Sequence, residues 1–369
     1  MLSLFISFTI ESNAQKFAII SDMQGATSNT YDVSLLVKSH SPEFIITGGD
    51  NHYGTISTID EQIGQFYSDY IFPYIGAYVS GSTQNNFYPC LGNHDIEGAG
   101  FSDYTQYFEL PGNERYYDYV KGNVHFFVLN CNPSEADGVS DTSLQAYWLH
   151  DHMVMSNSPF NVVYFHFPPY SSSMHGSTPG MRWPFKQWGA SIVFSGHDHD
   201  YERLLVDSLP YVVCGLGGGP LYTQYTPLPE SQFHDSSHHG AVFANATAGS
   251  ITFEFRTTTD SLVDQFTLYH IPESISKLNQ SDTKAAKLFS VSPNPLNEAS
   301  VIKFYLPHRG KIELSIHDIY GKCVQIISTY SMDEGIHNLQ FNKHQLKAGL
   351  YFIKLVFENS NCTQKAIIL

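Results

Sequence analysis

One repeated pattern constrains this chain more than any other feature: short apolar runs that each end in polar side chains. The runs cover residues 16–20, 44–47, 87–91, 124–129, 162–165, 191–194 and 211–214. They are continuous and rich in β-branched and aromatic residues, as expected of strands that are covered on both faces. A helix is predicted over 144–153, with Leu144, Trp148 and Leu149 on one face. The pattern therefore predicts an α/β fold with polar residues at the carboxyl ends of strands, where ligands bind in such sheets.

Five of these strand ends carry residues that bind metals well. The donors are Asp22, Asp50, Tyr53, Asn93, His94, His166, His197 and His199. Carboxylate and phenolate oxygens, an amide and several imidazoles suit iron, manganese or zinc better than calcium or magnesium. Eight donors exceed what one tetrahedral ion needs, so we predict two ions that share Asp50. Two such ions polarise a phosphoryl group and lower the pKa of a bridging water, so that the bridging hydroxide is the predicted nucleophile.

Each element also has an ordinary structural explanation. A histidine in an apolar strand, such as His166, is more often a core residue, and Gly196-His197-Asp198-His199 can be a solvated turn. Asn93-His94-Asp95 can be a turn or a helix cap. Five such elements, all closing strands in one chain order, favour the metal hypothesis over five separate coincidences.

The ordered set of elements resembles the calcineurin-like metallophosphoesterases and, within them, the purple acid phosphatases. The matching elements are Asp22, Gly49-Asp50-x-x-Tyr53, Gly92-Asn93-His94-Asp95, Val163-x-x-His166 and Gly196-His197-x-His199. In the purple acid phosphatase branch, the tyrosine takes the coordination place of a histidine two residues after the first aspartate. Here that place is Gln24, so Tyr53 fills it. The resemblance covers residues 16–260 and implies a four-layer α/β/β/α sandwich with the site at one edge of two sheets.

The resemblance also implies a role for each matched residue. It implies Fe(III) held by Asp22, Asp50, Tyr53 and His199, and a divalent ion (iron, zinc or manganese) held by Asp50, Asn93, His166 and His197. His94 would hydrogen-bond the phosphate or protonate the leaving oxygen, and His175 matches a second histidine on the substrate side. The first element departs from the family, which often has Asp-x-Gly where this chain has Asp22-Met23-Gln24-Gly25.

Weaker candidates lie outside these elements. Arg182 is a candidate for substrate binding because arginine pairs well with phosphate, and the alternative is a surface loop anchored by Trp183. Asp198 and His52 are expected to support the ligands or to face solvent. One histidine-rich stretch is predicted to be a solvated loop and not a metal site: His234, His238 and His239.

Charge is distributed unevenly along the chain, whose net charge is −16. Residues 1–260 carry 8 Lys and Arg against 26 Asp and Glu, whereas residues 261–369 carry 11 against 9. The change of sign indicates a domain boundary near residues 260–290. An acidic body does not attract a polyanion, so we expect a small phosphate-ester substrate and no nucleic acid polymer.

The first residues are typical of an export signal. Residues 2–10 are apolar, and Ser12-Asn13-Ala14 fits a cleavage site before Gln15. The run is much shorter than the roughly 20 residues of a membrane span, and no other segment is long enough, so no transmembrane segment is expected. The alternative for this run is a first β-strand. The predicted domains are a signal peptide (1–14), a metallophosphoesterase catalytic domain (15–270), a linker (271–288) and a C-terminal β-sandwich (289–369).

The last residues show a different pattern. Ile312, Leu314 and Ile316 alternate with polar residues, and 349–354 forms a second strand-like run, so a small antiparallel β-sandwich is predicted. The tail resembles the carboxy-terminal sorting domain of the type IX secretion system, through residues 292–295 (SPNP), 318–321 (DIYG), 348–351 (AGLY) and Lys365. The resemblance implies export machinery as a partner and export through the periplasm, with tail cleavage or cell-surface attachment. A carbohydrate-binding module, the alternative, would need exposed aromatic side chains on one face.

These observations predict a secreted or surface-attached dinuclear phosphoesterase that hydrolyses phosphate monoesters at acidic to neutral pH. A phosphodiesterase acting on nucleotides or phospholipid headgroups would use the same metal core and is an alternative. A non-enzymatic surface binding protein is a third hypothesis, which the presence of the full donor set with His94 and His175 disfavours.

Overall fold

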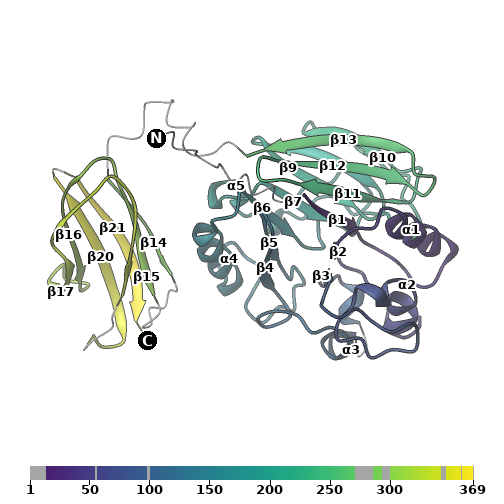
Figure 1. Cartoon of the computed structure of the whole chain (residues 1–369), viewed down its shortest axis with the longest axis horizontal. Coiled ribbons are helices and arrows are strands. Elements are labelled where there is room, and N and C mark those ends of the chain that lie inside the picture. The colour runs from purple at the N-terminus through teal and green to yellow at the C-terminus, as the bar shows by residue number, and fades with distance from the viewer. Residues whose placement is uncertain are drawn as a thin grey trace, which may run out of the picture. The chain divides into compact units, whose positions relative to one another are not determined.

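The computed structural model describes most of the chain, in two compact units (Figure 1). The described residues are 14–54, 56–97, 100–270, 286–292, 300–341, 346–358 and 360–368. One unit comprises residues 1–149 and 156–270, and the other comprises residues 150–155 and 271–369. The predicted signal peptide and most of the predicted linker lie outside the described residues, so these boundaries stay predictions.

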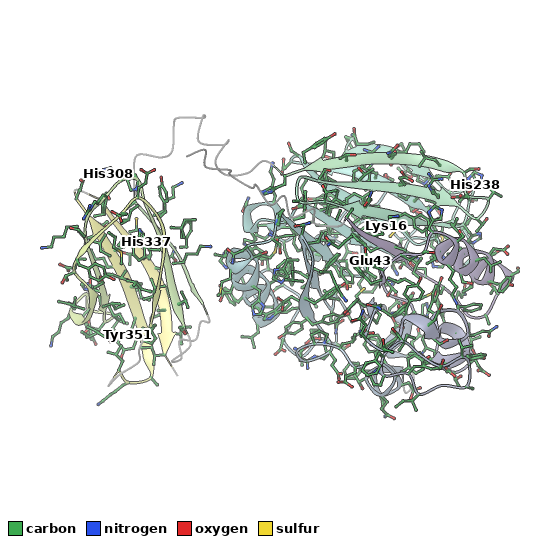
Figure 2. The ribbon with its side chains drawn as sticks, in the orientation of Figure 1. Lys16, Glu43, His238, His308, His337 and Tyr351 are labelled. Atoms are coloured by element: carbon green, nitrogen blue, oxygen red, sulfur yellow. The ribbon has the colours of Figure 1, made fainter. Side chains whose placement is uncertain are left out.

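The first unit contains a six-stranded sheet in the order β13-β12-β11-β1-β2-β3. Its strands are β1 (Gln15–Ile20), β2 (Phe44–Thr47), β3 (Phe87–Pro89), β11 (Gly240–Ala246), β12 (Ser250–Thr257) and β13 (Leu262–Tyr269). The strands β1, β2 and β3 are parallel, and Ile20 lies opposite Thr47. Near the starts of β1 and β2, the Glu43 N–H donates to the Lys16 carbonyl oxygen at 2.8 Å, and the Lys16 N–H donates to Glu43 Oε1 at 3.2 Å (Figure 2). The loops after β1 and β2 therefore leave the sheet side by side.

The second sheet has seven strands in the order β10-β8-β9-β7-β6-β5-β4. Its strands are β4 (Tyr117–Lys121), β5 (Val124–Val128), β6 (Phe160–Tyr164), β7 (Ile192–Ser195), β8 (Tyr201–Val206), β9 (Leu209–Cys214) and β10 (Ser231–Asp235). The central strands β5, β6, β7 and β9 are parallel. Their carboxyl ends share one edge, which brings the loops after β6 and β7 together. All seven strands predicted from apolar runs are present.

The two sheets pack face to face around one hydrophobic core. Phe17 of β1 contacts Phe126 of β5 with ring centroids 5.2 Å apart, and Phe194 of β7 contacts Phe253 of β12 at 5.3 Å. Helices cover the outer faces, which confirms the predicted four-layer arrangement (Figure 1). The helices are α1 (Ser28–Ser39), α2 (Gln65–Tyr67), α3 (Gly100–Tyr107), α4 (Leu144–Met155) and α5 (Phe185–Trp188), with shorter turns at Asp60–Gly64, Ser68–Tyr70, His94–Ile96 and Pro179–Met181.

The predicted helix over 144–153 is confirmed as α4, but its buried face differs from the prediction. Leu149 is buried, whereas Leu144 is 66% exposed. The buried positions next to Leu149 are Gln145 and Ala146. The buried stripe is therefore rotated by one to two residues, because the side chain of Gln145 turns inward to bond the backbone at Asn130.

The second unit is an antiparallel β-sandwich with its own hydrophobic core. Its strands are β14 (Lys287–Ser292), β15 (Val301–Leu306), β16 (Gly310–His317), β17 (Cys323–Ser328), β18 (Ser331–Met332), β19 (Gly335–Gln340), β20 (Gly349–Phe357) and β21 (Ser360–Ile368). Ile312, Leu314 and Ile316 of β16 all lie in the core, which confirms the predicted alternation. Among the described helices of both units, none combines the length and apolar character that crossing a bilayer requires.

Candidate metal centre

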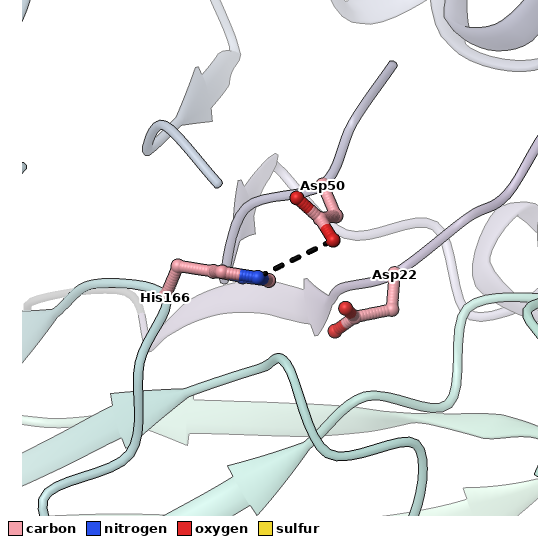
Figure 3. A group of neighbouring side chains, drawn as sticks. All are labelled: Asp22, Asp50 and His166. Atoms are coloured by element: carbon pink, nitrogen blue, oxygen red, sulfur yellow. Dashed lines mark ion pairs between the residues drawn. The ribbon is translucent and has the colours of Figure 1, made fainter. Parts of the chain in front are cut away.

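Three buried side chains from three strand ends converge at one edge of the first unit (Figure 3). Asp22 follows β1, Asp50 follows β2 and His166 follows β6. Each offers a metal-binding atom, and these atoms lie within 4.8 Å of one another. Asp50 Oδ2 and His166 Nε2 lie 3.3 Å apart. The structure thus brings together donors that are up to 144 residues apart in the sequence.

The backbone at this edge adopts conformations that are unfavourable for ordinary residues. Asp22, Asp50 and His197 have φ angles of 59°, 49° and 72°, in the left-handed region. The neighbouring glycines leave room for them, since a Cβ at Gly92 would clash with the Asp50 carboxylate and one at Gly196 with Asp22. Strain of this kind is retained mainly at functional sites, where it fixes the direction of a side chain.

Two histidines are oriented by backbone carbonyl groups. His166 Nδ1 lies 2.8 Å from the Gly48 carbonyl oxygen, and His199 Nδ1 lies 2.9 Å from that of Pro220. Each Nδ1–H donates, which leaves Nε2 directed at a carboxylate. His199 Nε2 lies 3.4 Å from Asp22 Oδ1. Metal-binding histidines are held in the same way, through the second ring nitrogen.

Two further donors lie beside His166. His197 Nδ1 is 3.2 Å and Asn93 Oδ1 is 3.0 Å from His166 Nε2. Burial and the charge of His166 lower the pKa of His197 to about 3. A neutral imidazole at this place keeps a lone pair for a cation. Asn93, His166 and His197 therefore form one subset of donors, with Asp50 as its carboxylate.

Tyr53 lies on the other side of Asp50. Its hydroxyl is 3.4 Å from Asp50 Oδ2, and its ring is stacked on His94 with centroids 4.1 Å apart. Burial, followed by the charges of Asp22 and Asp50, raises the pKa of the Tyr53 hydroxyl. A phenolate at this place needs a compensating cation.

The charge balance of the cluster fits metal ions. Asp22 and Asp50 are buried, and no Lys or Arg in the described part of the chain forms an ion pair with either. Burial opposes ionisation of Asp50, but His166 and His94 lower its pKa to about 2, while Asp50 overcomes burial and raises the pKa of His166 to about 9. Adjacent buried carboxylates whose only cationic partners are histidines are costly, and bound cations would remove that cost.

A pocket of about 250 Å³ opens above these donors. Its lining residues are Gln24, Asp50, Tyr53, Asn93, His94, His175, His197, His199, Pro220 and Tyr222. Both predicted substrate-side histidines, His94 and His175, are therefore at the pocket. Gln24 stands where the family has a histidine. Its Oε1 atom is buried and has no hydrogen-bond partner among the described residues.

Two residues near the pocket were not given a role by the sequence analysis. Glu97 Oε1 lies 3.0 Å from Nδ1 of His94, which lines the pocket, but the pair lacks hydrogen-bond geometry. Tyr222 is stacked on His199, with centroids 4.4 Å apart and an angle of 7°. Glu97 could have been found from its i+3 spacing to His94, whereas Tyr222 lies in a loop without any motif.

Asp95, the last residue of Asn93-His94-Asp95, has a structural role that its motif does not reveal. Its buried carboxylate accepts the backbone N–H groups of Gly92 (2.8 Å), Asn51 (3.2 Å) and His52 (2.8 Å). It thereby joins the loop after β3 to the loop after β2. Asp198 is also buried, as expected for a residue that supports the ligands.

Arg182 lies in a different pocket from the predicted ligands. Its guanidinium lies 4.3 Å from the centroid of the Tyr170 ring, and its Nε–H donates to the Pro169 carbonyl at 3.0 Å. That pocket is lined by Trp183, Lys186 and other residues, none of which lines the pocket at Asp50. The structure does not bring Arg182 to the candidate site, because Pro169 and Tyr170 hold its side chain.

Replacing Arg182 with alanine is therefore expected to leave phosphoester turnover and KM within about twofold of wild type, as for surface substitutions away from a site. Steady-state kinetics on a phosphomonoester would measure this. His175→Ala is the matched comparison, since His175 lines the pocket. A KM that rises as much in Arg182→Ala as in His175→Ala would contradict the expectation.

The histidine-rich stretch at 234–239 does not form a metal cluster. His234 lies in β10, not in a loop as predicted, and its Nε2 is 3.0 Å from Asp200 Oδ2. His239 bonds the Gly219 carbonyl, and His238 lies at the rim of the unit beside Asp235 (Figure 2). Among the described residues, these three histidines thus have three different partners.

Comparisons with known proteins agree with this geometry. The profile of the calcineurin-like phosphoesterase family matches residues 15–201, and that of the secretion system C-terminal sorting domain matches residues 290–369. Purple acid phosphatase 23 of Arabidopsis thaliana is 28% identical over 225 residues, which cover 51% of this chain and 47% of that protein. Purple acid phosphatase 15 of the same plant is 28% identical over 224 residues, or 51% and 40% of the two proteins. The match spans less than half the length of these relatives.

Among solved structures, GAP50, the anchor in the inner membrane complex of Plasmodium, has a similar fold. It aligns with a TM-score of 0.57 at 15% identity, over 70% of this chain and 90% of that one. At this identity the likeness concerns the fold alone. It agrees with the arrangement of two facing sheets described above.

Proposed function

This chain belongs to the calcineurin-like phosphoesterase family, and we propose that it is an exported phosphomonoesterase of the purple acid phosphatase type. Family membership and the purple acid phosphatase relatives make it a metal-dependent phosphoester hydrolase. The observation that carries the finer proposal is the position of Tyr53 next to Asp50, inside a group of buried carboxylates and imidazoles. A phenol among the donors is the feature that distinguishes this branch from others with the same carboxylates and histidines.

We propose that the donors divide into two sets around Asp50. One set would hold Fe(III), through Asp22, Asp50, Tyr53 and His199, and the other a divalent iron, zinc or manganese ion, through Asp50, Asn93, His166 and His197. When bound, the two ions would stabilise charge on the phosphoryl group and activate the attacking water. Support comes from the two halves of the cluster, since His199 approaches Asp22 while Asn93 and His197 approach His166.

The pocket residues supply binding and proton transfer. His94 is one-third exposed and lines the pocket, and its Nε2 lies 3.9 Å from Asp50 Oδ2. A partly exposed imidazole at this place is suited to donate a proton to the leaving oxygen of the ester. His175 also lines the pocket, is stacked on His197 with centroids 4.3 Å apart, and would hydrogen-bond the phosphate.

His94→Ala is expected to lower kcat by roughly a hundredfold or more, which is the usual contribution of a positioned general acid. Metal content should not change, because His94 is outside both proposed sets of ligands. Turnover of esters with good and poor leaving groups would separate the two roles of this residue. A general acid matters most for the poor leaving group, so equal losses for both esters would contradict proton donation and favour phosphate binding.

Tyr53→Phe is expected to remove the visible absorption of the iron-loaded protein. A ferric ion would displace the phenolic proton despite the raised pKa, as metal ions do for their ligands, and a phenolate bound to Fe(III) absorbs visible light. Absorption spectra of the iron-loaded protein measure this directly. Tyr222→Phe is the matched control, because it removes the other tyrosine hydroxyl of the pocket. A colourless wild-type protein with bound Fe(III) would refute the role of Tyr53.

The proposed function is tested by comparing an aryl phosphomonoester with an aryl phosphodiester. The protein would be reconstituted with iron and then with zinc or manganese, and its metal content measured. Faster cleavage of the monoester supports the phosphatase proposal. Faster cleavage of the diester would support the alternative hypothesis, a phosphodiesterase acting on nucleotides or phospholipid headgroups. A protein that binds both metals and cleaves neither ester would favour a binding protein or an enzyme that is highly selective for another substrate.

The second unit bears on where the reaction takes place. Its match to the secretion system C-terminal sorting domain marks the protein as one exported to the cell surface or beyond. We propose that it crosses the periplasm on this route, and that the tail contacts the export machinery. The substrate would then be a small phosphate ester outside the cell.

A further inference from the structure

Two loops meet above the candidate metal centre. The loop after β6 carries His175, and the loop after β9 carries Tyr222. His175 Nε2 lies 3.2 Å from the Tyr222 hydroxyl, and His175 is also stacked on His197. These two side chains form one wall of the pocket. Neither loop contains a helix or strand at this point, so something else must hold the wall in place.

One residue, Ser172, bonds both loops to the sheet. Its backbone N–H donates to Glu202 Oε2 at 2.8 Å, and its hydroxyl donates to Glu202 Oε1 at 2.6 Å. Its carbonyl oxygen accepts the Thr226 N–H at 2.7 Å, and its hydroxyl oxygen accepts the Leu228 N–H at 2.9 Å. Four hydrogen bonds at one serine thus connect the His175 loop, the Tyr222 loop and strand β8.

Glu202 is an unusual partner for a serine. It is fully buried, and no Lys or Arg in the parts of the chain that the structure describes pairs with it. Both of its oxygens are instead bonded to Ser172. A buried carboxylate held by neutral donors is costly, and the cost is recovered only through hydrogen bonds of good geometry. The length and direction of the bonds at Ser172 are therefore closely determined.

A second carboxylate holds the other end of the His175 loop. Asp198 Oδ2 accepts the Ser171 hydroxyl at 2.5 Å, and Asp198 Oδ1 accepts the His175 N–H at 2.8 Å. Asp198 lies between His197 and His199. The segment that carries two proposed ligands thus also carries this second anchor of the loop, and the position of His175 is set relative to the candidate metal donors.

We propose that Ser172 and Glu202 are positioning residues, which hold His175 and Tyr222 against each other and so set the affinity of the pocket for phosphate. This inference rests on the proposed function, since it assigns the pocket wall to the phosphate group. Neither Ser172 nor Glu202 lines the pocket, and both act through the loops that they join. We call the hydrogen bonds between Ser172 and Glu202 the joint. Loss of this joint would free the side chains of His175 and Tyr222 without removing any proposed metal ligand.

The test uses the full chain, loaded with metal, and inorganic phosphate as the probe. Ser172→Ala is expected to weaken phosphate binding roughly tenfold, because it removes a hydrogen bond to a charged group. Ser173→Ala is the matched control: Ser173 is buried in the same loop, but its hydroxyl has no hydrogen-bond partner. Its phosphate affinity should stay within about twofold of wild type. Glu202→Gln, which keeps one acceptor for Ser172, should show a smaller loss, and it replaces Ser172→Ala if that variant does not fold.

A double-mutant cycle separates positioning from a general loss of stability. In a His175→Ala background, Ser172→Ala should change phosphate affinity by less than about twofold, since the side chain that it positions is gone. Amide hydrogen exchange over 168–176 and 220–229 should accelerate in Ser172→Ala but not in Ser173→Ala. Equal losses of affinity with and without His175, or unchanged exchange in Ser172→Ala, would overturn the proposal.

Failure of the proposed function would look different. A wild-type protein that turns over no phosphoester refutes the phosphatase proposal, yet phosphate affinity and exchange in the variants still decide the role of the joint. If the wild-type protein hydrolyses esters and Ser172→Ala binds phosphate as tightly as wild type, the positioning role of Ser172 and Glu202 is refuted. The phosphatase proposal is then unaffected.

Discussion

Replacing Asp50 with asparagine is expected to abolish phosphoester hydrolysis while leaving the protein folded. In the proposed arrangement Asp50 is the carboxylate that the two donor sets share, so its loss should release at least one metal ion. Metal ions contribute several kcal/mol of transition-state stabilisation, and about 4 kcal/mol corresponds to roughly a thousandfold in rate. We therefore expect kcat/KM to fall by about that factor or more.

The stability of the metal-free protein should change little in this variant. Asparagine has the same shape as aspartate and can still accept the His94 backbone N–H, which bonds Asp50 Oδ1 at 2.9 Å. It also removes a buried charge and lets His166, which pairs with Asp50 at 3.3 Å, become neutral, so that no unpaired charge is left buried. Chemical unfolding of the metal-free proteins, metal analysis and steady-state kinetics would measure the three effects separately.

Asp264→Asn is the matched control. Asp264 is also buried, but it is paired with Arg203 at 2.7 Å and bonded to the Tyr201 hydroxyl at 2.8 Å, and it does not line the pocket. Its variant should lose about 1–3 kcal/mol of stability, as hydrogen bonds to charged groups do, and keep its metals and turnover. A destabilised Asp50→Asn that retains activity would reverse this pattern and refute the role of Asp50.

Removal of the second unit is expected to abolish export and leave hydrolysis intact. Each unit has its own hydrophobic core, and the whole candidate metal centre lies in the first. A chain that ends at His270 should therefore fold, bind metals and turn over substrate with a kcat within about twofold of the full chain. In the native host it should accumulate inside the cell envelope, because the sorting domain is absent.

Activity assays on the purified short chain, and cell fractionation of the host, would measure the two effects. Residues 289–369 fused to an unrelated exported reporter provide the positive control, since the tail alone should direct that reporter to the surface or the medium. Export of the short chain at the wild-type level would contradict a sorting role for this unit. Loss of turnover in the short chain would show that the units depend on each other.

Much of the fold and of the candidate site can be predicted from the sequence, for a local reason. An apolar run of strand length that is followed within a few residues by a donor can be recognised from neighbouring positions in the sequence alone. The seven runs are strands in the structure, and Asp22, Asp50 and His166 converge because β1 and β2 are adjacent and the sheet that contains β6 packs against theirs. The metal roles of the individual donors remain predictions.

Other features depend on loops that come together from distant parts of the chain. Tyr222 stacks on His199 and Ser172 bonds Glu202 only because the loops after β6 and β9 cross the same sheet edge. Nothing in the local sequence distinguishes Ser172 from Ser173, although one makes four hydrogen bonds and the hydroxyl of the other makes none. Arg182 has the right chemistry for phosphate, but the fold holds it against Tyr170.

The sequence by itself thus determined the order of strands and donors and the class of chemistry, because residue type and spacing are local properties. Only the tertiary structure decided which polar side chains meet at the candidate metal centre, which line its pocket and which hold the loops, because those positions depend on distances between segments far apart in the chain.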